Sequence, residues 1–260
     1  MKSIVKACLA WGALSLTPAS AADLISATAP QDSTVAQAGW TYSVTPYFWA
    51  AGLSGQTSQF NLPVVDIDSS FTDIFDNLDF AAMVMGEARH DRFSVFGDVM
   101  YTKLSTGAAT PRGIAATSVD LDASTFAGLA GVGYSVIEGS AGRLDVVGAV
   151  RVWSVDTEIS FSGAFLNGQS RSDSATWVDG LVGVRGTYNF NPKFYAFGWG
   201  LVGAGGADVD WDVMAGVGYN INESLSATLG YRALGVDYSD DGFLFDVVEQ
   251  GPMAGLTVRF

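Results

Sequence analysis

The strongest constraint on the fold of this chain is an alternation of apolar and polar residues with a period of two. In the clearest segment, 208–221, one parity is apolar or aromatic and the other is polar or small. Successive side chains of a β-strand point to opposite faces, so this segment predicts a strand with one apolar and one polar face. The pattern returns at 143–153, 175–190 and 225–233. We therefore predict an all-β protein.

The charged residues of the polar face distinguish between two all-β folds. In a soluble β-sandwich these residues would point into the core, where burial at that density is too costly. In a transmembrane barrel they line a hydrated or ion-paired lumen, while the apolar face meets lipid. We therefore predict an antiparallel up-and-down transmembrane barrel. The predicted lumen-lining residues are Glu87, Arg89, Asp98, Arg151, Asp179, Arg185, Arg232 and Glu249.

The alternating segments indicate about ten strands, an even number as in bacterial single-chain barrels, with eight or twelve as alternatives. Short turns belong on the periplasmic side and longer loops outside, which places both ends of the barrel in the periplasm. The predicted strands are 40–54, 79–90, 93–105, 119–137, 142–161, 174–190, 193–204, 208–221, 224–238 and 243–260. The predicted outer connections are 55–78, 106–118, 162–173, 239–242 and a tight one at 205–206.

Both ends of the chain carry export features. Lys2 and Lys6 accompany an apolar run that is too short for a membrane helix, and small residues at 19–21 follow, which is typical of a cleaved signal peptide. The only cysteine, Cys8, lies in that segment. The final strand ends on Phe260, which looks like the signal that the barrel-assembly machinery recognises. The predicted organisation is a signal peptide at 1–21, a mobile tail at 22–39 and an outer-membrane barrel at 40–260.

Two motifs carry a resemblance to a known family. One combines Trp40 with TPYFWAAGLSG at 45–55, and the other combines SFTDI at 70–74 with NLDF at 77–80. Here the chain resembles a family of uncharacterised proteobacterial outer-membrane proteins, among the small opacity-type and OmpA-like barrels. The likeness continues at Glu87-Ala88-Arg89 and Phe96-Gly97-Asp98. It implies a barrel in the cell outer membrane, and it implies no catalytic or binding site.

The charge of the chain limits its partners. The sequence has 27 acidic and 13 basic residues, a net charge of −14, which argues against nucleic acid as a partner. The expected partners are outer-membrane lipid and lipopolysaccharide, with divalent cations bridging to the anionic head groups. No GxxxxGK[ST] phosphate loop is present, and we expect no cofactor. The sequence leaves the oligomeric state open.

An enzymatic role has little support in the sequence. The outer-membrane enzymes built on small barrels are proteases, lipid A deacylases and palmitoyl transferases, and those known to us place a histidine near the outer rim. The single histidine, His90, falls at a predicted periplasmic turn between Arg89 and Asp91. We therefore expect a turn residue there rather than a catalytic base, and no enzyme.

Two further groups are candidate sites. Oxygen ligands suit Ca²⁺ or Mg²⁺, so aspartates on two neighbouring outer strand ends form a weak divalent-cation candidate, with a solvated acidic rim as the alternative. These are Asp208, Asp210, Asp237, Asp240 and Asp241.

Within 55–78, an apolar i, i+3, i+4, i+7 stripe capped by Ser70 predicts a short helix that either plugs the lumen or packs on neighbouring loops. The stripe consists of Phe71, Ile74, Phe75 and Leu78.

The aromatic residues are expected to form girdles at the two membrane interfaces, which requires no ligand. The predicted girdle residues are Trp40, Tyr47, Trp49, Tyr101, Tyr134, Trp177, Tyr188, Phe190, Trp211, Tyr219 and Tyr231.

Since a ten-strand barrel is narrow, inward charges are expected to pair across it. The favoured function is a structural or surface-interaction role with acidic extracellular loops. The alternatives are a small, weakly cation-preferring pore and, below it, a lipid-modifying hydrolase.

Overall fold

The computed structural model describes residues 39–60, 62–109 and 117–260. The predicted signal peptide, nearly all of the predicted tail and residues 110–116 of the predicted loop 106–118 lie outside the described residues. The unit that begins at residue 38 is almost entirely β-structure. No helix in the described ranges is long and apolar enough to cross a membrane.

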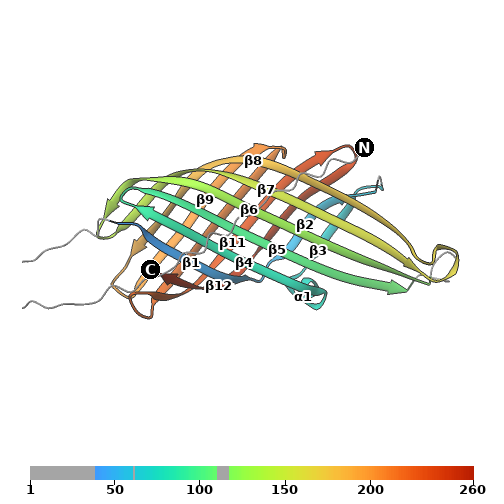
Figure 1. The fold of residues 1–260 in the computed structure, drawn as a ribbon, viewed down its shortest axis with the longest axis horizontal. Coiled ribbons are helices and arrows are strands. Elements are labelled where there is room, and N and C mark those ends of the chain that lie inside the picture. Colours follow the sequence, from blue (N-terminus) through green and yellow to red (C-terminus); the bar gives the residue numbers. More distant parts are fainter. Residues whose placement is uncertain (1–38, 61, 110–116) are drawn as a thin grey trace, which may run out of the picture. The chain divides into compact units, whose positions relative to one another are not determined.

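Ten strands form a closed antiparallel ring (Figure 1). β1 pairs with β4 on one side and with β12 on the other, and each of β4 to β12 pairs with its neighbours in sequence. The ring confirms the predicted barrel. Its strands are β1 (Thr41–Trp49), β4 (Leu78–His90), β5 (Phe93–Ala109), β6 (Ser118–Gly139), β7 (Gly142–Ser162), β8 (Gln169–Asn189), β9 (Phe194–Gly205), β10 (Val209–Asn220), β11 (Leu225–Asp240) and β12 (Phe243–Arg259).

The predicted strand 40–54 and loop 55–78 differ from the structure. The strand is interrupted at residues 50–51, after which β2 (Gly52–Ser58) continues along the outer half of β12. β3 (Val65–Ser69) then pairs back on β2, and α1 (Phe71–Asp76) leads into β4. The interruption lies where the chain comes very close to Gly251, since a Cβ on that glycine would meet the Ala50 carbonyl oxygen at 2.0 Å.

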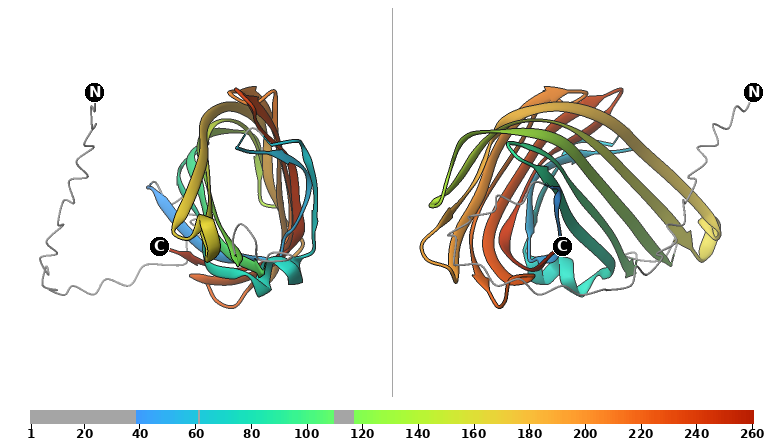
Figure 2. Two further views of the ribbon diagram at one scale, coloured as in Figure 1. Left: turned by 90° about the vertical axis from the view of Figure 1, so that its right-hand side faces the viewer. Right: turned by 60° about the vertical axis from the view of Figure 1, so that its left-hand side comes forward.

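The barrel wall has unequal height (Figure 2). β6, β7 and β8 contain 21 or 22 residues each, whereas β9 and β10 contain 12 each. The additional residues of β6–β8 lie at the end opposite the chain terminus Phe260, so one side of the wall stands above the other. The turns at the Phe260 end are short, as predicted, and the turn Asp241–Gly242 at the other end is shorter than predicted.

The outer face of the ring is apolar. Large hydrophobic side chains are exposed in every strand of the ring, and they alternate with buried ones. Aromatic pairs lie on this face near both ends of β4, with Trp40 against His90 at one end and Phe80 against Tyr101 at the other. An apolar band between two aromatic layers is what a lipid-facing barrel surface requires.

Candidate functional site: the barrel lumen

The inward parity carries the charges that the sequence predicted for it. Asp98, Arg151, Asp179 and Arg232 are fully buried, and Arg89 is nearly so. Glu87 and Arg185 are partly buried, and Glu249 lines a cavity in the outer half of the lumen. All eight predicted lumen residues therefore face inward, because the strict alternation of a strand sends one parity to one side.

Arg232 is the centre of a charge network across the middle of the lumen. One of its Nη atoms lies 2.7 Å from both Asp98 and Asp212, which come from β5 and β10. Its other Nη atom donates to the Tyr47 hydroxyl at 2.8 Å, and that hydroxyl in turn donates to Asp98. The guanidinium also lies 5.3 Å from the Trp49 ring centroid, so charge pairs and a cation–π contact offset its desolvation together.

Arg151 of β7 extends this network to its other side. It forms ion pairs with Asp210 at 2.5 Å and Asp212 at 2.6 Å. Two indole N–H groups donate to the same carboxylates, Trp153 to Asp210 and Trp199 to Asp212. The network therefore links strands on opposite sides of the ring and occupies the middle of the lumen.

A second charge cluster lies nearer the Phe260 end of the barrel, which the short turns predict to be periplasmic and which we call the periplasmic end. Glu87 forms ion pairs with Arg185 at 2.5 Å, Arg89 at 2.9 Å and Arg143 at 3.3 Å. Arg89 also pairs with the fully buried Asp145. One carboxylate shared by three guanidinium groups leaves this part of the lumen positive, in contrast to the acidic chain as a whole.

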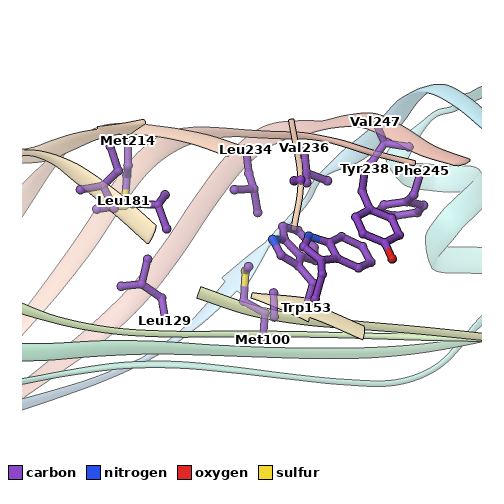
Figure 3. Packing of buried hydrophobic residues seen from close by; sticks show 14 of the residues in the cluster. Met100, Leu129, Trp153, Leu181, Met214, Leu234, Val236, Tyr238, Phe245 and Val247 are labelled. Atoms are coloured by element: carbon purple, nitrogen blue, oxygen red, sulfur yellow. The ribbon is translucent and has the colours of Figure 1, made fainter. Parts of the chain in front are cut away.

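Aromatic side chains fill the lumen on the outer side of the central network (Figure 3). Trp177 stacks between Tyr238 at 4.0 Å and Trp153 at 5.9 Å, measured between ring centroids, and Phe245 packs against both tryptophans. The rings bury apolar surface against one another, and the indole N–H of Trp153 has a carboxylate acceptor, whereas the buried indole N–H of Trp177 has no hydrogen-bond partner among the described residues.

This layer corrects part of the predicted aromatic girdle. Tyr47, Trp49 and Trp177 are buried inside the barrel, not exposed to lipid. Their parity is that of inward polar residues, Trp177 with Asp179 for example, so strict alternation could have placed them. Their aromatic character favours a girdle position, whereas their parity favours the lumen, and the same is true of the buried Trp153 and Trp199. Most other predicted girdle residues are exposed on the outer face: Trp40, Tyr134, Tyr188, Phe190, Tyr219 and Tyr231.

Two cavities lie on the two sides of the central network. The periplasmic cavity of about 610 Å³ has a mixed polar and apolar lining that includes Glu87, Arg143, Arg185 and Arg259. The outer cavity of about 430 Å³ is mainly apolar, and Glu249 is the one charged residue of its described lining.

The aspartates proposed as a cation site do not gather into one site. Asp210 is fully buried and pairs with Arg151. Asp237 lies opposite Asp246 in the β11–β12 ladder, and its backbone carbonyl accepts a hydrogen bond from the Asp208 N–H. Asp240 and Asp241 lie at the exposed β11–β12 turn. Among the residues that the structure describes, no cluster of His, Cys, Asp or Glu could hold a metal ion. The burial of Asp210 depends on its cross-lumen partner, which the sequence does not reveal.

The predicted helix forms, but it lies in the wall and not across the lumen. Ser70 caps α1 and exchanges reciprocal hydrogen bonds with Asp73. The Phe71 ring packs edge-on against Phe48, which belongs to the outward parity of β1, and Phe75 is 54 % exposed. The apolar stripe thus borders the barrel wall, between the β2–β3 hairpin and the start of β4.

Three predicted residues remain, and two of them, His90 and Phe260, lie at the periplasmic end. His90 ends β4, and its Nδ1 atom lies 3.3 Å from the exposed Asp91 carboxylate. Phe260 exchanges backbone hydrogen bonds with Tyr42 and its side chain is exposed. Asp179, on the outer side of the lumen, accepts a hydrogen bond from the Ala207 backbone. Among the described residues, Asp91 is the one carboxylate within ion-pair distance of His90.

Comparison with solved structures supports the fold. The outer-membrane protease OmpT of Escherichia coli is similar with a TM-score of 0.53 at 12 % identity, over 88 % of this chain and 99 % of that chain. Ail of Yersinia pestis gives a TM-score of 0.37 at 15 % identity, over 85 % and 99 % of the chains. A major outer-membrane protein of Thermus thermophilus gives 0.41 at 13 %, also over 85 % and 99 %. The likeness to OmpT shows an outer-membrane β-barrel fold. No family model and no curated protein sequence matches the chain.

Proposed function

We propose that this protein resides in the outer membrane as a closed barrel and acts through its outer rim, as a structural or surface-interaction protein. The observation that carries this proposal is the charge network of Arg151, Arg232 and their carboxylates. It spans the middle of the lumen and separates the two cavities. Water-filled conduction would have to break several buried ion pairs, each of which is costly to leave unpaired.

The outer rim offers the surface for such a role. β6, β7 and β8 project above the short strands β9 and β10, and their outer halves carry outward Ser, Asp and Glu side chains such as Asp156 and Glu158. This acidic surface would bind lipopolysaccharide phosphates through divalent cations, or a basic partner directly. We assign no catalytic role, since His90 lies at the opposite end.

Single-channel conductance of the refolded protein in a planar bilayer tests the proposal, with heat-shifted gel mobility to show that the barrel has formed. We expect a folded barrel that does not conduct ions. The variant Arg151→Ala/Arg232→Ala, if it still folds, is expected to conduct, because it removes both cations that bridge the lumen. Steady steps from the unmodified protein would instead establish the alternative, a pore, and cation preference would agree with its acidic mouth.

A further inference from the structure

The hydrogen-bonded ring of strands is incomplete on one side of its outer half. Within the described residues, β3 pairs with β2 on one edge and with no strand on the other. β4 begins only at Leu78, opposite Leu104, so beyond Ser105 the strand β5 continues with β6 as its one partner. The wall between β3 and β5 is therefore not closed by a strand ladder, and α1 lies beside this interval.

The outer cavity reaches this interval from inside the barrel. Its inner lining comes from inward residues of β5, β6 and β7, including Leu104, Leu121 and Thr157. Its lining also includes Phe48, an outward residue that is 47 % exposed, and Phe71 and Phe75 of α1. The cavity is thus lined by both inward and outward residues of the wall, as a lateral opening between β3 and β5 requires.

The position of this passage indicates what enters it. Phe48 and Phe80 mark the outer end of the apolar band, where Phe80 pairs with Tyr101 in the outer aromatic layer. An opening there faces the hydrocarbon of the outer leaflet close to the head groups. The cavity volume, about 430 Å³, lies within the range of about 300–1,000 Å³ that is usual for ligand sites.

The chemistry of the lining selects an apolar and flexible occupant. Most of the lining is Leu, Ile, Val, Ala, Phe or Thr, and it also includes Glu249 and Trp49, whose ring contacts Arg232 of the charge network. A water-soluble polar solute would lose its hydration here without replacement hydrogen bonds. A hydrocarbon chain gives up no hydration when it moves from the bilayer into such a space, so its transfer carries no desolvation cost.

We propose that the outer cavity binds one acyl chain of an outer-leaflet lipid, which enters sideways between β3 and β5 past α1. The head group stays at the interface beside the exposed face of α1, and the chain lies inside the barrel above the central network. The barrel thus holds a membrane lipid as a ligand. This role goes beyond the surface role proposed above and does not depend on it.

Photo-crosslinking in vesicles tests this proposal. The refolded protein is placed in phosphatidylcholine that carries a diazirine at the end of one acyl chain, and the crosslinked residues are identified by mass spectrometry. We expect crosslinks at inward residues of the outer cavity, Leu121 and Thr157, besides those on the outer face. The inward residue Thr228 lines the periplasmic cavity and is the internal control, since no lipid should reach it.

A matched pair of variants separates cavity binding from general lipid contact. Ala123→Trp fills the cavity from β6, whereas Ala130→Trp adds the same side chain to the lipid-facing side of the same strand. Crosslinks at Thr157 should disappear in the first variant and persist in the second, with both barrels heat-modifiable on a gel. Should Ala123→Trp not fold, Ala81→Trp fills the same cavity from β4.

Two outcomes would overturn the proposal. One is crosslinking confined to outward residues in the unmodified protein. The other is labelling of Leu121 and Thr157 by a free diazirine fatty acid but not by the phospholipid, which would mean that the occupant does not enter from the membrane. Conductance is independent of both outcomes, so a conducting barrel would refute the closed lumen without deciding whether lipid binds.

Discussion

The two halves of the lumen are built on the same alternation but differ in content. In the periplasmic half and the middle, ten strands close the ring, and inward positions carry Arg and Asp in mutual ion pairs. In the outer half, the β2–β3 hairpin takes the place of a full-length strand, and the inward positions are mainly apolar. Buried charges need partners at fixed distances, which a closed ring provides, whereas apolar side chains tolerate an incomplete wall.

The largest expected effect comes from breaking the charged half. Arg232→Ala leaves Asp98 and Asp212 buried without their shared cation, so the free energy of unfolding should fall by about 3–5 kcal/mol. Urea titration of the barrel in lipid vesicles measures the change. The control is Arg92→Ala, which removes an exposed pair with Glu138 at 3.8 Å and should cost roughly 0–1 kcal/mol. Equal losses of unfolding free energy in the two variants would contradict the conclusion that Arg232 holds the buried charge network together.

A leucine from each half tests how tightly each half is packed. Leu234 is 1 % exposed and belongs to the packed cluster, so Leu234→Ala should cost about 2–5 kcal/mol. Leu121 borders the existing outer cavity, so Leu121→Ala removes fewer contacts and should cost less than the lower end of that range. The same urea titration compares them. A larger loss at Leu121 than at Leu234 would show that the outer half is packed as densely as the middle.

The smallest expected effect concerns the cap of α1, the helix at the border of the outer half. Hydrogen bonds from the Ser70 hydroxyl and backbone N–H hold the pKa of the Asp73 carboxyl below its usual value. The folded helix therefore prefers the ionised carboxylate. Its contribution is complete above the pKa of unfolded Asp73 and is lost as the pH falls through the lower pKa of the folded helix.

Amide hydrogen-exchange protection of α1, corrected for the intrinsic pH dependence of exchange, measures this effect. Protection should fall at acid pH in the unmodified chain and be low at all pH values in Asp73→Asn. Asp76→Asn is the control, since Asp76 lies at the other end of the helix and takes no part in the cap. If Asp73→Asn keeps full protection, the cap does not hold the helix, and the border of the outer cavity must depend on the Phe71–Phe48 contact.

The sequence by itself determined the barrel, the direction of its side chains and most strand boundaries. The alternation acts locally: once residue 209 faces lipid, residue 210 faces the lumen, and no distant contact is needed to know it. The eight lumen charges were predicted for this reason. The helix at 71–76 was also predicted, since its apolar spacing and its Ser70 cap are local features.

Only the tertiary structure decided which inward residues meet. Arg151 and Asp210 lie 59 positions apart in the chain, and their ion pair depends on ring size and strand stagger, which no local pattern encodes. The same holds for the contacts of Trp49 and Trp177. Their parity directs both side chains to the lumen, but their partners there, Arg232 and Tyr238, come from a distant strand. The gap between β3 and β5 was also decided by the tertiary structure. Whether two strands pair depends on where each one lies in the ring, and the sequence of a single segment does not encode that position.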